Sequence, residues 1–419
     1  MIEQINLPNG VRVVTEHISH VRSVAIGIWV HAGSRYENEQ TNGLSHFIEH
    51  MLFKGTTTRS AAGIAEVFDE IGGYVNAFTA KEYTCYYAKV LDEHTSVALD
   101  VLSDMFFNSQ FDPNEIEKEK QVVVEEIRMV EGTPDDWVHD LVSEVSMPDD
   151  PLGYPILGSI NNVTGFQREQ LTQFIKNTYI PEHTVITVVG NFDQALHEQL
   201  LQLFGQFKQG DQFKQRVRKS PRFHAGIVQR VKPTEQAHLC LSLPGLALTD
   251  ERIYSLVLLN SIIGGSMSSR LFQRIREEYG LAYSVYSYHS TFRDCGSFVI
   301  YAGTGPHQVD SVCENVLDIL RDVRDNGVQA SELHKAKQQL KGSFTLSMES
   351  TTNRMSRLGK NELLLGKHPS YEEVMTHVNR IRLSDLNALA EQMFHNELSF
   401  AIISPEERLP KSFRRDALV

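Results

Sequence analysis

The sequence is poor in cysteine and contains no long apolar run. Only four cysteines occur among its 419 residues, and no two of them have the CxxC spacing of zinc or redox motifs. Such scattered thiols argue against a disulfide framework and favour a reducing compartment, in which they serve as small buried apolar groups. The longest apolar stretches, such as residues 24–30, have the length of a strand and fall well short of the ~20 residues of a membrane-spanning helix.

The sequence also contains fewer basic than acidic residues. The 40 lysines and arginines face 53 aspartates and glutamates, which gives a formal net charge of −13 at pH 7. This balance argues against nucleic acid and anionic membranes as partners, and it is compatible with cationic ligands such as basic peptides. The first ten residues show neither the basic nor the apolar part of a secretory signal, so we expect a cytoplasmic location.

The two halves of the chain repeat one order of strands and helices. The helical stretch 114–129 aligns without a gap with 331–346, and the helix and strand at 171–190 resemble those at 386–404. Positions of the first pair that keep their residue type are Glu115 and Glu332, Ile116 and Leu333, Lys118 and Lys335, Lys120 and Lys337, and Gln121 and Gln338. We therefore expect an α+β protein built by tandem duplication.

A polar stretch rich in glutamine, lysine and arginine separates the repeats. It predicts an N-terminal domain over 1–208, a linker over 209–222 and a C-terminal domain over 223–419. Strands interleaved with helix pairs predict, in each domain, a mainly antiparallel sheet with helices packed on one face.

Residues 43–56, GLSHFIEHMLFKGT, carry two histidines four positions apart. On a helix, His46 and His50 lie on one face about one turn apart, so both can bind the same zinc ion. Glu49 projects beside them and can act as general base toward a water that such an ion activates. The motif alone leaves a second interpretation open, an amphipathic helix whose histidines merely flank its buried stripe.

A second predicted helix, residues 117–129, carries two carboxylates seven positions apart. Glu119 and Glu126 are separated by about two turns and share nearly one face. One of them can complete a zinc site while the other holds a histidine in its correct tautomer, although a solvated charged face would look similar. The aligned second half has Ala336 and Ser343 at these positions and contains no HxxEH, so we expect a single site per chain.

These residues resemble the pitrilysin family of zinc peptidases, which includes insulin-degrading enzyme and the mitochondrial processing peptidase. In that family HxxEH is followed, some seventy-odd residues later, by two glutamates seven apart. The resemblance implies that His46, His50 and Glu126 bind one Zn²⁺ per chain. It also implies that Glu49 is the general base and that Glu119 supports a histidine ligand from behind.

Residues 72–87 resemble the family segment in which an Asn-Ala pair on a sheet edge binds substrate as an added strand. This likeness implies that Asn76 and Ala77 contact substrate. An exposed strand edge offers unpaired N–H and C=O groups to an extended peptide. From the residues alone, Asn76 is equally well explained as a turn residue.

Residues 269–287 resemble the family's Arg-to-Tyr segment. The resemblance implies that Arg276 and Tyr283 contribute to catalysis, because a guanidinium and a phenol can stabilise a developing oxyanion and hold the substrate backbone. Without the resemblance, a salt bridge at a helix end and a core tyrosine would be the simpler interpretation.

The resemblance covers nearly the whole chain and is closest to half-length bacterial members similar to the catalytic subunit of the mitochondrial processing peptidase. Longer members carry four such units, whereas this chain carries two, with the zinc residues and the Arg276–Tyr283 pair in different halves. We therefore expect a homodimer with composite sites, in which the partner copy supplies that pair. A hetero-oligomer is the alternative.

The expected activity is that of a zinc-dependent endopeptidase that hydrolyses short or unfolded peptides inside an enclosed chamber. The acidic balance favours basic peptides as substrates. One alternative is a catalytically silent subunit that binds peptides or has a structural role, against which the intact HxxEH and Glu126 argue. Another is a purely structural zinc ion, which predicts unfolding on chelation.

Overall fold

The computed structural model describes residues 2–208, 220–407 and 409–419. These residues form two compact units, each built around one sheet. The first unit comprises residues 2–128, 155–208 and 345–368, and the second comprises the remaining described residues. Within these ranges, no helix combines the length and the apolar character that crossing a membrane requires.

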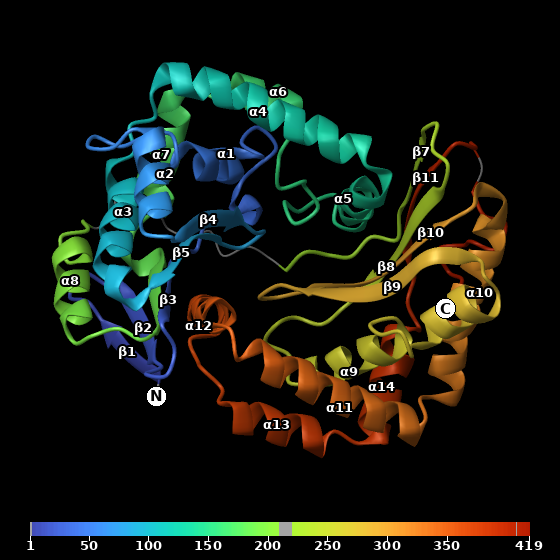
Figure 1. Cartoon of the computed structure of the whole chain (residues 1–419). Helices are drawn as coiled ribbons and strands as arrows, with labels where there is room; N and C mark the ends of the chain where they lie inside the picture. The colour runs from blue at the N-terminus through green and yellow to red at the C-terminus, as the bar shows by residue number, and fades with distance from the viewer. Residues whose placement is uncertain (1, 209–219, 408) are drawn as a thin grey trace. The chain divides into compact units, whose positions relative to one another are not determined.

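The first unit contains a six-stranded sheet in the order β1–β2–β6–β3–β5–β4 (Figure 1). Its strands are β1 (Ile2–Asn6), β2 (Arg12–His17), β3 (Ser23–Val30), β4 (Tyr74–Thr79), β5 (Thr84–Leu91) and β6 (Thr184–Gly190). β2 and β6 run parallel, and the other neighbouring pairs are antiparallel. The central strand β3 is buried along nearly its whole length, whereas β4 lies at an edge.

Helices cover one face of this sheet and enclose the main core of the unit. They are α1 (Leu44–Met51), α2 (Ala61–Glu70), α3 (Thr95–Asn108), α4 (Pro113–Gly132), α6 (Ile160–Gly165), α7 (Arg168–Thr178) and α8 (Ala195–Phe204), with short helices η1 (Ser34–Tyr36), η2 (Asp92–His94) and η3 (Pro181–His183). The apolar stripe of α1 explains its orientation, because Leu44, Phe47, Ile48 and Met51 recur at helical spacing and are all buried.

The opposite face of the sheet is covered by α12 (Thr351–Leu365), a helix from the C-terminal half of the chain. It packs on β3 and β6, with Met355 and Leu358 against Trp29. A Cβ atom at Gly359 would lie 2.1 Å from the Trp29 indole, so only glycine allows this close approach. The second face of the sheet also carries buried apolar side chains, and α12 covers them.

The second unit contains a five-stranded sheet in the order β7–β11–β8–β10–β9 (Figure 1). Its strands are β7 (Ile227–Val231), β8 (Ala237–Pro244), β9 (Ala282–Thr291), β10 (Gly296–Thr304) and β11 (Ser399–Ser404). One face packs on helices α9 (Ile253–Ile263), α10 (Val309–Asn326), α11 (Ala330–Ser347), α13 (Tyr371–Arg380) and α14 (Leu383–Met393), with the π-helix η4 (Phe272–Glu278) and the short η5 (Pro306–Gln308). On the other face lies α5 (Pro134–Ser146), which the N-terminal half provides.

The prediction of a duplicated α+β fold with helix-covered sheets is confirmed. In addition, each sheet receives a second cover from the other half of the chain, since α5 follows α4 as α12 follows α11. The predicted ranges 1–208 and 223–419 each contain one of the two sheets, but they do not coincide with the compact units. Residues 129–154 belong to the second unit, and residues 345–368 belong to the first. The predicted linker at 209–222 lies mostly outside the described residues.

Candidate metal centre

The helix α1 begins without a capping side chain of its own. Its N-cap residue, Gly43, has a φ of 98°, and a Cβ atom there would lie 2.6 Å from the Leu157 carbonyl oxygen. Glu37 supplies the cap instead: its carboxylate accepts hydrogen bonds from the backbone N–H of Gly43 at 2.8 Å and of Ser45 at 2.6 Å. Burial raises the pKa of Glu37, and the helix N–H groups partly oppose this shift. Glu37 therefore fixes the start of the helix that carries HxxEH.

Three predicted ligands come together in the first unit. Donor atoms of His46, His50 and Glu126 all lie within 4.8 Å of one another. Oε2 of Glu126 lies 3.9 Å from Nε2 of His46 and 3.6 Å from Nε2 of His50. Donors around one tetrahedral zinc ion stand about 3.4 Å apart, given bonds of ~2.0–2.2 Å. The spacing therefore fits one such ion between the three side chains.

The donor atoms themselves also indicate a cation. Oε2 of Glu126 is buried, and no hydrogen bond to it is found among the described residues. A buried carboxylate oxygen without a hydrogen bond is unfavourable, and a bound cation would compensate for it. The Glu126 side chain as a whole is 34% exposed, so the cost concerns this one oxygen. Burial lowers the pKa of His46 to about 3, with a further contribution from neighbouring His50. His46 is therefore neutral, as a metal ligand must be.

A hydrogen bond to Glu119 sets the orientation of the His50 ring. Nδ1 of His50 lies 2.7 Å from Oε1 of Glu119, so Nδ1–H donates this bond and Nε2 is left for a metal. Burial alone would lower the pKa of His50, but the Glu119 hydrogen bond and the charge of Glu126 raise it. Burial alone would raise the pKa of Glu119, but hydrogen bonds from His50 and Lys54 lower it.

Glu49 lies beside the three ligands and accepts a hydrogen bond of 2.5 Å from Oγ1 of Thr79, at the end of β4. Burial raises its pKa, and the Thr79 bond partly opposes that shift. A carboxylate with a raised pKa next to a metal site has the properties of a general base. Sequence reasoning missed Thr79, although it follows the Asn76–Ala77 pair by two residues.

The structure places Asn76 and Ala77 within β4 rather than in a turn. In the part of the chain that is described, β4 pairs with β5 alone, so its other edge is available to an extended peptide. The Asn76 side chain is exposed and donates to the Tyr74 hydroxyl at 2.5 Å. α1 packs against β4, and the last residue of β4, Thr79, contacts Glu49 of this helix.

Arg276 and Tyr283 belong to the second unit, where the structure brings them together. The Arg276 guanidinium lies 4.9 Å from the Tyr283 ring centroid and 4.8 Å from that of Phe272. Tyr283 is 76% exposed and is therefore not a core tyrosine. Arg276 lies in the π-helix η4, a rare conformation that is frequent at functional sites.

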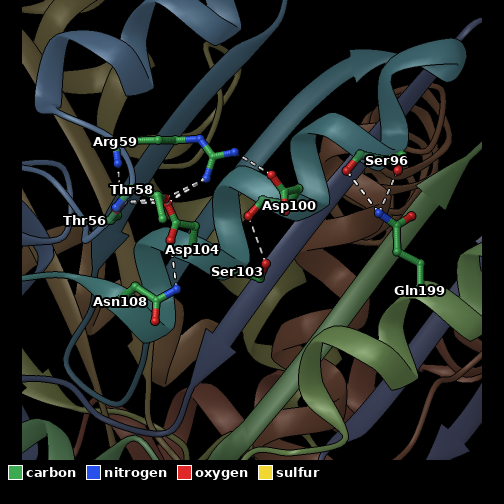
Figure 2. Close-up of polar contacts among 9 residues, drawn as sticks. All are labelled: Thr56, Thr58, Arg59, Ser96, Asp100, Ser103, Asp104, Asn108 and Gln199. Carbon is green, nitrogen blue, oxygen red and sulfur yellow. Dashed lines mark hydrogen bonds and ion pairs between the residues drawn. The ribbon is translucent and has the colours of Figure 1, made fainter.

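The loop after α1 is held by one buried carboxylate of α3 (Figure 2). Oδ2 of Asp104 accepts hydrogen bonds from Oγ1 of Thr56 at 2.7 Å, Oγ1 of Thr58 at 2.8 Å and Nη1 of Arg59 at 2.7 Å. Its Oδ1 accepts from Nδ2 of Asn108 at 2.8 Å. This network ties the loop that leaves the metal centre to the helix behind it.

We expect Asp104→Asn to lower the free energy of unfolding by about 2 kcal/mol at pH 7, because it removes a buried charge that four donor groups share. Burial alone would raise the pKa of Asp104, but its hydrogen bonds hold it below the ordinary value. The contribution is therefore complete above the unfolded pKa of ~3.9 and is lost as pH falls through the lower folded value. Denaturant titrations from pH 7 to pH 3 measure both effects.

The matched control is Asp100→Asn, since the Asp100 side chain is half exposed and also pairs with Arg59. A surface ion pair contributes about 0–1 kcal/mol, so its loss should be hard to detect. Equal destabilisation by both substitutions would show that Asp104 has no special role in holding the loop.

With this geometry established, the comparisons with known proteins identify the class. A sequence profile described as insulinase (peptidase family M16) matches residues 12–160, and one described as the peptidase M16 inactive domain matches residues 165–340. The chain belongs to peptidase family M16, and the resemblance inferred from HxxEH and its distant glutamates is confirmed.

Particular relatives extend over the whole chain. A protein of Bacillus subtilis named uncharacterized zinc protease YmxG is 51% identical over 410 residues, which cover 98% of this chain and 100% of the relative. An uncharacterized zinc protease of Streptomyces coelicolor is 40% identical, with 100% of this chain and 92% of the relative covered.

Solved structures agree on the fold. The crystal structure of a protease from Helicobacter pylori has a TM-score of 0.90 at 20% identity, and the match covers 97% of this chain and 99% of that one. A Pseudomonas fluorescens structure described as a peptidase M16 inactive domain also gives 0.90, at 19% identity, over 98% of this chain and 99% of that one.

Proposed function

We propose that this protein is a zinc-dependent endopeptidase that hydrolyses short or unfolded peptides. The proposal depends mainly on one observation, the convergence of His46, His50 and Glu126 next to Glu49. Among the described residues, the buried Oε2 of Glu126 has no hydrogen-bond partner. Membership of a peptidase family and the names of the zinc-protease relatives support it.

Nε2 of His50, a ring nitrogen of His46 and the Glu126 carboxylate would hold the ion. Zinc bound there supplies Lewis acidity, which polarises a carbonyl and makes a neighbouring water more acidic. Glu49 accepts a proton from the attacking water and passes it to the leaving amine. The hydrogen bond from Thr79 keeps the Glu49 carboxylate in place for both transfers.

Substrate binding is proposed at the free edge of β4. A peptide that adds to this edge must be extended, which selects short or unfolded chains over folded ones. The edge carries Asn76 and Ala77 and ends at Thr79, the hydrogen-bond partner of Glu49, so an added strand runs toward the general base. We further propose that Arg276 and Tyr283 stabilise the oxyanion from a partner copy, and that the net charge of −13 favours basic peptides.

Zinc analysis combined with peptide digestion tests the proposal. We expect about one zinc per chain and cleavage of a mixed peptide library, read by mass spectrometry. A chelator should stop cleavage, and added zinc should restore it. Matched acidic and basic peptides test the substrate preference in the same assay.

Circular dichroism of the chelated protein separates a catalytic ion from a structural one. The proposal predicts that helix content persists after zinc removal, because the core around α1 is formed by apolar side chains. Loss of the fold on chelation would favour a structural ion. Cleavage that is insensitive to the chelator, or a protein without bound zinc, would contradict the proposal.

A further inference from the structure

Lys54 follows His50 by four residues and contacts the residue that orients it. Nζ of Lys54 lies 2.7 Å from Oε2 of Glu119, while Nδ1 of His50 lies 2.7 Å from Oε1 of the same carboxylate. The two oxygens of Glu119 are therefore divided between one histidine and one lysine. The Glu119 side chain is only 4% exposed, and that of Lys54 is 30% exposed.

A carboxylate in this position depends on its partners. Removing a charged group from water is costly unless hydrogen bonds and an opposite charge compensate for it. With both oxygens engaged, Glu119 cannot turn about its terminal bond without losing a contact. Lys54 thereby restricts Glu119 to the orientation in which Oε1 meets Nδ1 of His50.

Lys54 is itself held by the backbone on both sides. Its N–H donates to the Met51 carbonyl at 3.1 Å, which continues the end of α1. The next residue, Gly55, has a φ of 112°, and its carbonyl accepts a hydrogen bond from the N–H of Gln110 at 3.2 Å. The loop then enters the network around Asp104 (Figure 2). The backbone of Lys54 is thus held in place within the unit, which limits the positions that its side chain can reach.

Lys118, the residue before Glu119, pairs with a carboxylate of its own helix. Lys118 contacts Glu115 three residues away on α4 at 2.6 Å, and its side chain is largely exposed. Such a pair contributes little to a neighbouring site. The Lys54–Glu119 contact instead joins the end of α1 to α4, the two helices that provide the metal ligands.

We propose that Lys54 is a positioning residue of the metal centre. It holds Glu119 in place so that Glu119 keeps Nε2 of His50 directed toward Glu126. The inference rests on the proposed zinc site and adds a residue outside the HxxEH motif to it.

The test is the zinc affinity of the full-length Lys54→Met variant, measured by competition with a chromophoric chelator. Loss of a residue that hydrogen-bonds a metal ligand lowers affinity by about 10–100-fold. Lys54 acts through such a residue, so we expect a decrease of about tenfold, at the lower end of that range. Lys118→Met, on the helix that carries Glu119, is the control and should bind zinc as the wild type does. Circular dichroism verifies that each variant is folded.

Two further measurements separate positioning from general stability. ¹⁵N NMR of the metal-free proteins should show the Nδ1–H tautomer of His50 in the wild type and a mixture of tautomers in Lys54→Met. In a Glu119→Gln background, Lys54→Met should cause no additional loss of affinity, because Lys54 acts through Glu119.

The outcomes are distinguishable. A wild-type protein that binds no zinc contradicts the proposed function whatever Lys54 does. Normal zinc binding by the wild type together with unchanged affinity and an unchanged His50 tautomer in Lys54→Met overturns the inference, as does an additive loss in the Glu119→Gln background. If Lys54→Met fails to fold, Lys54→Gln replaces it: loss of the charge should lower zinc affinity by about tenfold, and unchanged affinity would overturn the inference.

Discussion

Glu49→Gln should lower the rate of peptide hydrolysis by about a thousandfold, the middle of the range for a lost general base. The amide keeps the size of the side chain and can still meet Thr79, so the local packing is preserved. It cannot accept the proton of the attacking water. The zinc ligands are not changed, and we expect the variant to contain as much zinc as the wild type. Rates on one cleavable peptide and elemental analysis of the same samples measure the two quantities.

The control for this prediction is Glu66→Gln on the exposed side of α2, which should leave both rate and zinc content unchanged. Zinc loss from Glu49→Gln would mean that Glu49 belongs to the ligand set. Full activity of the variant would assign the base to another residue and would remove the main argument for the proposed mechanism.

Glu126→Gln should abolish both zinc binding and hydrolysis. It replaces a carboxylate, whose oxygen faces both histidines, by a neutral amide that is a poor zinc ligand. Loss of a residue that hydrogen-bonds a ligand lowers zinc affinity by about 10–100-fold. Loss of the ligand itself should lower zinc affinity by more. Competition with a chelator gives the affinity, and peptide digestion gives the activity.

Glu125→Gln provides a closely matched comparison, because Glu125 is the preceding residue on the same helix. Its side chain is exposed and pairs with Arg128 at 2.6 Å. This variant should retain zinc and activity. A pair of variants with the same zinc affinity would disprove the assignment of Glu126 as the third ligand.

The proposed zinc ligands could be located in the sequence because each part of the candidate site has a local sequence signal. Two histidines at helical spacing share a face of α1, and two glutamates seven apart share a face of α4. The internal repeat added information, because the second copy keeps the helix and lacks its carboxylates. The family resemblance then decided between Glu119 and Glu126, which spacing alone left open.

The supporting residues could not be predicted in this way. Glu37, Thr79 and Lys54 act across loops or between elements that are distant in sequence, and their neighbours in the chain resemble ordinary loop and strand residues. The residue directly before α1 is Gly43, which has no side chain to cap the helix. The carboxylate that does so, Glu37, lies six residues upstream. Similarly, the amphipathic patterns of α5 and α12 show that each has a buried face but do not show which sheet it covers.

Because α5 and α12 exchange between the halves, each sheet is covered on one face by a helix that the other half of the chain encodes. One face of the sheet in the unit of the metal centre is covered by residues 351–365, which are translated long after the proposed ligands. During synthesis, all strands of the first sheet are therefore made before the helix that covers one of its faces. Substitutions in α12 can therefore affect the sheet of the metal centre although α12 is distant from that centre in sequence.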